Sequence, residues 1–148
     1  MSSLTKKQLP MEAIVPLIRE NLAQGKTVRF LPKGSSMKPM LRQGKDSVVL
    51  SPVPEKLQKY DLPLYQRRDG TYVLHRIVAV GDTYTCLGDN QLKPERGLRQ
   101  DQMIGLVTGF YRGSKYHSVT EPGYQLYCRV WSLLRRIVRR LKWLIKKI

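Results

Sequence analysis

Three short segments carry residue types that could perform covalent chemistry. The first spans residues 34–41 and reads Gly-Ser-Ser-Met-Lys-Pro-Met-Leu. A serine that leaves a glycine-containing turn and precedes a proline can expose the Ser36 hydroxyl and direct backbone N–H groups at one point. Acyl transfer requires both features. Composition alone favours a plain polar loop between strands. This segment therefore indicates an enzyme only if a base and an acid elsewhere in the chain can act with Ser36.

The other two segments supply a base and two acids. His75 stands among apolar neighbours in the stretch 72–80. A lone histidine there is more often a core residue, yet imidazole is the usual acceptor of a serine proton near neutral pH. Asp89 and Glu95 follow, and either carboxylate could orient an imidazole. The alternative for them is an ordinary turn, with Glu95 paired to Arg96 at the surface.

In this order and spacing the segments resemble the signal peptidase I superfamily. The likeness is to the branch that pairs serine with histidine, which includes endoplasmic reticulum, archaeal and sporulation-type enzymes. The Gly-x-Ser-Met-x-Pro-x-Leu pattern lies at 34–41, and His-Arg-Ile lies at 75–77. An acid box begins with Gly-Asp-Asn at 88–90 and continues through 95–98. The resemblance covers about residues 27–112.

The resemblance implies a role for each residue around the serine. Ser36 would attack the scissile carbonyl, and His75 would take its proton and return it to the leaving amine. The backbone N–H of Ser36 would contribute to the oxyanion hole. Gly34, Ser35 and Met37 would line the substrate and oxyanion subsite. The implied substrates are extended peptides with small residues at the −1 and −3 positions, which dock by strand addition.

Two departures from the family pattern bear on these roles. Glu95 stands where the family usually has aspartate and is one methylene longer. The choice between Asp89 and Glu95 as the residue that holds the imidazole therefore stays open, with Asp89 favoured. Gly34 stands where many members carry a serine that donates to the oxyanion. No cofactor is implied, and no metal is expected, because the two histidines and two cysteines lack ligand spacing.

The elements that must position these residues are mostly short strands. Apolar residues at helical spacing, followed by Gly25, predict a helix over residues 11–23. Segments rich in β-branched and aromatic residues predict strands at 27–31, 47–50, 62–66, 72–80, 84–87 and 103–111. Asp69-Gly70 predicts a hairpin turn.

The expected fold is mainly β. It is a signal-peptidase-like catalytic domain of β-clip or SH3-like architecture over residues 27–118. A helical segment over residues 1–26 precedes it, and a basic amphipathic helical tail over residues 119–148 follows it.

Composition fits one folded domain with a strong positive charge. Hydrophobic residues make up 41% and charged residues 26% of 148 residues, which excludes a disordered chain. Two cysteines cannot form a disulfide framework, so an oxidising compartment is not indicated. Lys and Arg number 27 against 11 acidic residues, a net charge of +16. This excess implies attraction to phosphate-bearing partners, either nucleic acid or anionic lipid.

Half of that net charge lies in residues 126–148, which hold eight basic residues and no acidic one. Apolar residues recur there in steps of three and four, from Leu126 to Ile148, and predict a helix with one apolar face. Such a helix suits a bilayer interface, where each basic residue contributes on the order of 1 kcal/mol near anionic lipid. The expected membrane-binding residues are Arg129, Trp131, Arg135, Arg136, Arg139, Arg140, Lys142, Trp143, Lys146 and Lys147.

Two other interpretations of this tail stay open. It could pack on the domain or a partner with a solvated basic face, or bind nucleic acid. Nucleic acid is the least favoured, because no recognition module is present.

The sequence predicts no transmembrane helix, since its longest charge-free run, 102–111, is about ten residues. It also shows no ordinary signal peptide. The expected location is peripheral, at a bacterial inner membrane, with the face of the membrane undecided. The expected partners are an anionic membrane surface and an extended peptide or protein leader.

The sequence thus predicts a small membrane-associated serine endopeptidase that cleaves a leader or signal peptide without metal or cofactor. One alternative is a repressor-type self-cleaving peptidase. That class uses a lysine base, whereas the base position here is His75, and residues 1–26 are too short for a helix-turn-helix. The other alternative is a non-catalytic β-domain that binds peptide or membrane. The oligomeric state is not predicted.

Overall fold

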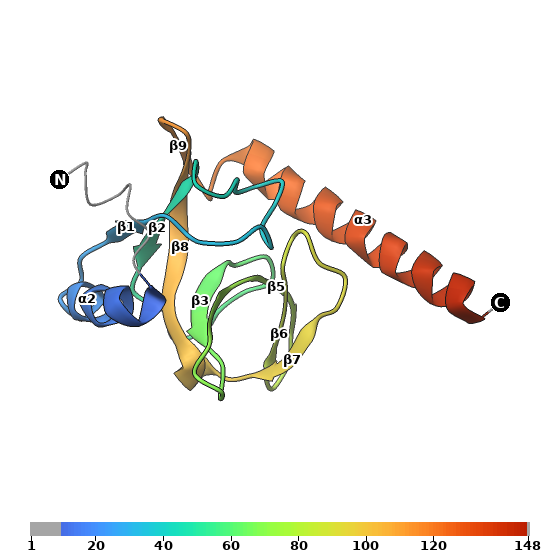
Figure 1. The fold of residues 1–148 in the computed structure, drawn as a ribbon, viewed down its shortest axis with the longest axis horizontal. Helices are drawn as coiled ribbons and strands as arrows, with labels where there is room; N and C mark the ends of the chain where they lie inside the picture. Colours follow the sequence, from blue (N-terminus) through green and yellow to red (C-terminus); the bar gives the residue numbers. More distant parts are fainter. Residues whose placement is uncertain (1–9, 148) are drawn as a thin grey trace.

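Two antiparallel sheets form the body of the protein, with one helix at each end of the chain (Figure 1). The structure is a computed structural model and describes residues 10–147. In chain order the elements are α2 (Met11–Ala23), β1 (Val28–Phe30), β2 (Ser47–Ser51), β3 (Pro63–Gln66), β4 (Tyr72–Leu74), β5 (Arg76–Val80), β6 (Tyr84–Leu87), β7 (Glu95–Leu98), η1 (Gln100–Gln102), β8 (Met103–Arg112), β9 (Lys115–Ser118) and α3 (Pro122–Lys147). The structure is mixed: its antiparallel strands and two terminal helices agree only roughly with the predicted mainly β class, and the helix over 11–23 has the predicted bounds.

The larger sheet has the order β1-β2-β8-β3-β4, with β9 paired to β8, and the smaller has the order β5-β6-β7. Strand β8 is the centre of the larger sheet, because it pairs with β2, β3 and β9 along its ten residues. The Asp69-Gly70 turn joins β3 to β4 as predicted, and Gly70 adopts the φ of 92° that this turn requires.

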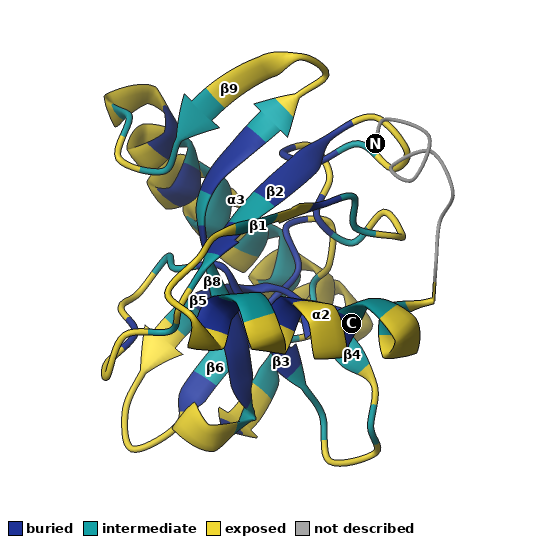
Figure 2. Ribbon diagram, turned by 90° about the vertical axis from the view of Figure 1, so that its left-hand side faces the viewer, coloured by how far each residue is buried: buried dark blue, intermediate teal, exposed yellow. Residues whose placement is uncertain are grey.

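Two apolar clusters lie on opposite faces of β3 and β4, because side chains alternate along a strand. Leu64 and Leu74 join the cluster that also contains the buried face of α2, and Tyr65 and Val73 join the cluster under the smaller sheet. Buried residues concentrate in the strands, and α2 alternates buried and exposed residues (Figure 2). The strands around His75 are therefore held from both sides.

The predicted strand over 72–80 is wrong in one respect: it is broken at His75. Strand β4 ends at Leu74 and pairs with β3, whereas β5 begins at Arg76 and pairs with β6 in the other sheet. The break carries no glycine or proline, and apolar residues continue on both sides of it. His75 therefore lies at the point where the chain passes from one sheet to the other.

Two strands, β7 and β9, were not predicted from the sequence. Both are short and rich in charged or polar residues, and both lie at a sheet edge, where such residues are tolerated.

The C-terminal helix begins at Pro122, three residues before the start that the pattern predicts near Gln125, with proline in the favoured first position. Its first half packs on the sheets and its second half extends past them (Figure 1). Within residues 10–147, no helix is long and apolar enough to span a bilayer.

Candidate active site

Ser36 and His75 meet at the junction of the two sheets. The Ser36 Oγ atom lies 3.2 Å from His75 Nε2, although 39 residues separate them in the chain. Ser36 comes from the turn between β1 and β2, and His75 comes from the break between β4 and β5. At this distance the hydroxyl donates to Nε2 whenever that nitrogen carries no proton, which is the ground state of a serine and its general base.

Burial keeps the His75 imidazole neutral. His75 as a whole is only 6% exposed. This burial, together with the nearby Arg67 charge, lowers the pKa of His75 from 6.5 to about 4, while Glu95 and Asp89 act weakly in the opposite direction. At neutral pH the ring is therefore unprotonated and can accept the Ser36 proton.

The Ser36 turn is fixed from below by apolar side chains. Gly34 opens it with a φ of 86°, a conformation that glycine adopts without strain. Met37, Met40 and Leu41 are buried beneath the turn, and the Leu41 N–H donates to the Met37 carbonyl at 3.0 Å. This packing holds the serine at the surface while its neighbours are anchored in the core.

The acid segment holds the same turn from the other side. The Asn90 N–H donates to the Ser36 carbonyl at 2.8 Å, and the Asn90 side-chain amide donates to the Ser35 carbonyl at 3.2 Å. A Cβ atom on Gly88 would lie 2.7 Å from the Ser36 carbonyl oxygen, so only glycine fits there. Residues 88–90 therefore position Ser36 through its backbone.

The Ser36 backbone N–H has no hydrogen-bond acceptor within residues 10–147. The carbonyl of Ser35, which shares a peptide unit with the Ser36 N–H, accepts from the Asn90 side-chain amide, so this peptide unit is fixed while its donor stays available. An oxyanion hole needs a fixed, unengaged donor of this kind next to the nucleophile.

Asp89, the favoured orienting acid, is not hydrogen-bonded to the imidazole. Its carboxylate binds Arg76 in bidentate fashion, with Nε–Oδ1 and Nη2–Oδ2 distances of 2.9 Å each. The Tyr127 hydroxyl of α3 also donates to Oδ2 at 2.6 Å, and Trp131 Nε1 donates to the Asp89 carbonyl at 2.6 Å. Asp89 thus joins the C-terminal helix to the segment that holds Ser36.

Arg76 is the centre of this buried polar cluster and is 1% exposed. Its Nη1 donates to the Tyr60 carbonyl, the Tyr124 hydroxyl and Cys128 Sγ at 2.8–3.1 Å. A buried guanidinium is stable only with a paired charge and satisfied donors, and here both conditions hold. The sequence pattern placed Arg76 in a signature with His75 but gave no sign of its partners on α3.

Glu95 is held by two other residues. Tyr65 Oη donates to Glu95 Oε1 at 2.7 Å, and Arg67 Nε donates to Oε2 at 2.9 Å. Burial raises the pKa of Glu95, but these two hydrogen bonds outweigh it and leave the pKa below its usual value. Among the described residues, then, neither Asp89 nor Glu95 hydrogen-bonds His75, and the expected third member of a triad is not found in that role.

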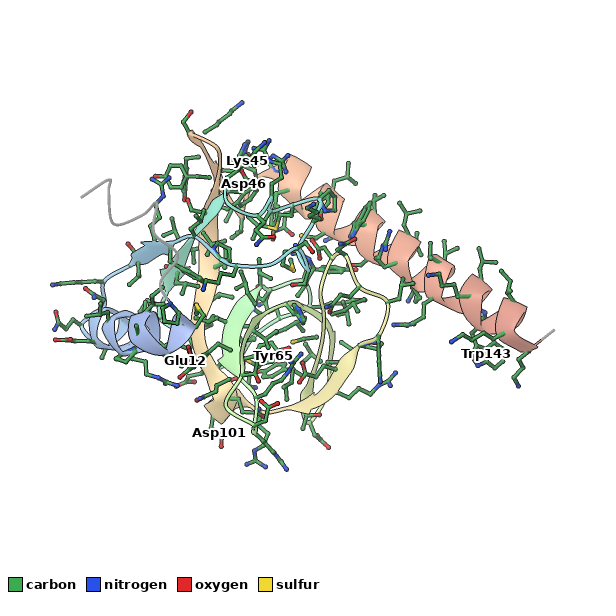
Figure 3. The ribbon with its side chains drawn as sticks, in the orientation of Figure 1. Glu12, Lys45, Asp46, Tyr65, Asp101 and Trp143 are labelled. Atoms are coloured by element: carbon green, nitrogen blue, oxygen red, sulfur yellow. The ribbon has the colours of Figure 1, made fainter. Side chains whose placement is uncertain are left out.

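Tyr65 is a site residue that the sequence analysis missed. Its ring meets the His75 ring edge-on, with centroids 6.4 Å apart and planes at 74°. It is fully buried among the strands (Figure 3) and its hydroxyl is tied to Glu95. Tyr65 therefore fixes the imidazole by contact, and Glu95 acts on His75 through it. A tyrosine in a buried strand looks like an ordinary core residue, so no sequence signal marks this role.

A cleft of about 230 Å³ opens over the serine and histidine. One wall is the chain after β1, including Lys33 and Gly34, and the opposite wall is β4 with the preceding turn. Ser36, Met37 and His75 also line it, as do Arg67 and Gln91. Ser35, expected to line the subsite with Gly34 and Met37, does not line this cleft, and its carbonyl accepts from the Asn90 side chain.

Comparisons with known proteins add no relationship to this geometry. No protein-family model matches the chain, and no curated protein matches it either. Across residues 10–147, no group of three or more His, Cys, Asp or Glu side chains is arranged to hold a metal ion.

Proposed function

We propose that this protein is a serine endopeptidase of the signal-peptidase-like class, built on the signal-peptidase-like variant of a mainly β fold. The observation that carries the proposal is the 3.2 Å approach of Ser36 Oγ to Nε2 of the neutral, buried His75 imidazole, beside a cleft that both residues line. A serine and an imidazole meeting by chance on a surface would not combine burial, a fixed turn and an open cleft.

The cleft favours an extended peptide as substrate. Strand β4 lines one wall, and within the described residues it pairs only with β3, so its other edge has free backbone groups. A peptide strand can add to such an edge through main-chain hydrogen bonds. Because the cleft is small, residues with small side chains are the expected occupants next to the scissile bond.

The proposed reaction uses three groups of this chain: the Ser36 hydroxyl, the Ser36 backbone N–H and the His75 imidazole. His75 Nε2 takes the Ser36 proton as Oγ forms a bond to the scissile carbonyl carbon. The Ser36 N–H stabilises the oxyanion, and the imidazolium then protonates the amine as the C–N bond breaks. Water then attacks the acyl carbon with His75 again as base, and the bond between that carbon and Ser36 Oγ breaks as the imidazolium returns its proton to Oγ, which releases the acid product. Tyr65 and the Arg76–Asp89 pair keep the base and the turn in place.

A peptide library tests this function without a known substrate. The full chain is incubated with a library of proteome-derived peptides, and new N-termini are identified by mass spectrometry. We expect new N-termini with the native protein and with Ser114→Ala, a serine in an exposed turn between β8 and β9, and none with Ser36→Ala. Identical sets from the native protein and Ser36→Ala, or none from either, would refute the proposal.

The intact mass of the protein, measured in the same reaction, separates cleavage of other chains from self-cleavage. The proposed endopeptidase leaves its own mass unchanged. A shortened native chain together with an intact Ser36→Ala chain would assign the site to the self-cleaving class instead.

A further inference from the structure

Helix α3 leaves its most apolar face uncovered. Eight apolar side chains along it are 45–68% exposed, and we call them the apolar stripe: Leu126, Val130, Leu133, Leu134, Ile137, Leu141, Leu144 and Ile145. They recur at intervals of three and four residues and so lie on one side of the helix. Ile148, predicted to extend this series, lies outside the described residues.

A different side of α3 contacts the domain. Tyr124 and Cys128 are buried there, Tyr127 and Trp131 bind Asp89, and the Arg135 guanidinium covers the Trp131 ring at 4.7 Å. Trp131 and Arg135, expected from the sequence to bind membrane, therefore belong to the inner face of the helix. Trp143 is 54% exposed and lies near the far end of α3, away from the sheets (Figure 3).

A row of positive charge borders the stripe on the side away from the domain. Arg129, Arg136, Arg140 and Lys147 are exposed and lie at helical spacing next to the stripe, and we call them the basic rail. After Glu121 the chain contains no acidic residue, so nothing on α3 neutralises this row. The outer surface of the helix thus combines apolar side chains with uncompensated positive charge.

These two features together select one kind of partner. A second copy of α3 would cover the stripe but bring two positive rails together with no acid between them, which opposes association. Nucleic acid would neutralise the rail but leave the apolar stripe in water. An anionic bilayer satisfies both, since lipid headgroups meet the rail while the acyl boundary takes up the stripe.

We propose that the outer surface of α3 binds an anionic lipid bilayer, with the helix lying along the membrane surface rather than crossing it. The stripe enters the boundary of the acyl chains, and the rail and Trp143 lie among the headgroups. Because the inner face of α3 is tied through Asp89 to the turn that carries Ser36, the bound helix also holds the candidate active site near the membrane. Lipid binding itself does not depend on the proposed peptidase activity.

Vesicle co-sedimentation of the full chain tests the proposal. We expect binding to vesicles of phosphatidylcholine mixed with phosphatidylglycerol, weakened by salt, and at least about a hundredfold weaker binding to phosphatidylcholine alone. Equal binding to the two vesicle types, or no binding to the anionic vesicles at low salt, would overturn it.

Two charge variants distinguish binding through the basic rail from non-specific attraction by the net charge of the protein. The first replaces the basic rail with glutamine, and the second replaces four exposed basic residues elsewhere, Lys26, Arg68, Lys93 and Lys115, so both variants lose the same charge. We expect about a hundredfold loss for the rail variant and less than about threefold loss for the control. Equal losses would show non-specific attraction and overturn the proposal.

A third variant tests the stripe with Leu134→Gln, Ile137→Gln and Leu141→Gln. These side chains are exposed, so the thermal unfolding temperature and circular dichroism should stay native while binding to the anionic vesicles is lost. Native binding by this variant would refute the role of the stripe. A native protein that sediments as a dimer, with this variant monomeric, would assign the stripe to a second copy instead.

Discussion

His75 and Arg76 are neighbours in the chain, and the fold uses them in opposite ways. Both side chains are nearly inaccessible, at 6% and 1% exposure. His75 meets a hydroxyl and no carboxylate among the described residues, so burial lowers its pKa and leaves the imidazole neutral. Arg76 meets Asp89 and several oxygen and sulfur acceptors, so burial leaves it charged and immobile.

This contrast follows from the break in the strand between them. Consecutive residues in a strand point to opposite faces, and here the chain also changes sheets, so the two side chains enter separate environments. One environment supplies a reactive pair open to a cleft, and the other supplies a fixed ion pair behind it. The charges of Arg76 and Asp89 are thus paired behind the cleft, whereas His75, beside Ser36, is kept neutral.

The largest expected effect is on activity. His75→Ala removes the base without leaving a buried charge, so cleavage of a library peptide should fall about a thousandfold while the fold is retained. Initial rates and the free energy of unfolding in urea are measured on the same preparation. If His75→Ala lost its fold along with its activity, His75 would support the structure as Arg76 does, and the difference drawn between the two residues would be wrong.

Arg76→Met, in contrast to His75→Ala, should act mainly on stability. It leaves the Asp89 carboxylate buried without its partner and should lower the free energy of unfolding by about 3 to 5 kcal/mol. A double variant with Asp89→Leu removes the stranded charge and should lose less than the single variant. Urea unfolding of both variants measures the difference, and a single variant that costs under about 1 kcal/mol contradicts the assignment of the pair.

The pH dependence of stability sharpens the same comparison. The unfolded imidazole binds a proton near pH 6.5 and the native one only near pH 4, so the native state binds fewer protons in this window. Stability should therefore fall as the pH drops from 6.5 to 4, by at most about 3 kcal/mol. In His75→Gln this part of the dependence should disappear. The same slope in both proteins would place the titration elsewhere.

The smallest expected effect concerns the link from α3. Tyr127→Phe removes one hydrogen bond to the Asp89 carboxylate and should cost about 1.5 to 3 kcal/mol of stability. Tyr116→Phe, in the exposed strand β9, is the matched control and should change stability by less than about 0.5 kcal/mol. Thermal unfolding compares the two, and equal values would show that Tyr127 does not support the cluster.

Local patterns were sufficient for much of the fold. Regular spacing of apolar residues and turn-forming residues predicted the helix over 11–23, the Asp69-Gly70 turn and most of the strands. The structure confirms these elements. The break at His75 has no such signal, because apolar residues continue through it. Strands β7 and β9 were missed because their polar residues suit sheet edges rather than a core.

The contacts of the candidate site could be predicted only in part. A motif placed Ser36 and His75 in one reaction, and the structure brings their side chains together. The partners of Asp89 come from β5 and α3, which are far apart in sequence, so no local pattern could identify them. On α3, periodicity located the apolar stripe, but it could not show that aromatic residues on another side dock on the domain.

The most direct test measures how fast Ser36 reacts with a fluorophosphonate probe as a function of pH. Mass spectrometry locates the label in the native protein and in His75→Ala. The account predicts labelling at Ser36, a rate that falls as the pH drops toward 4, and a rate about a thousandfold lower in His75→Ala. Equal rates in the two proteins, or no label on Ser36, would contradict it.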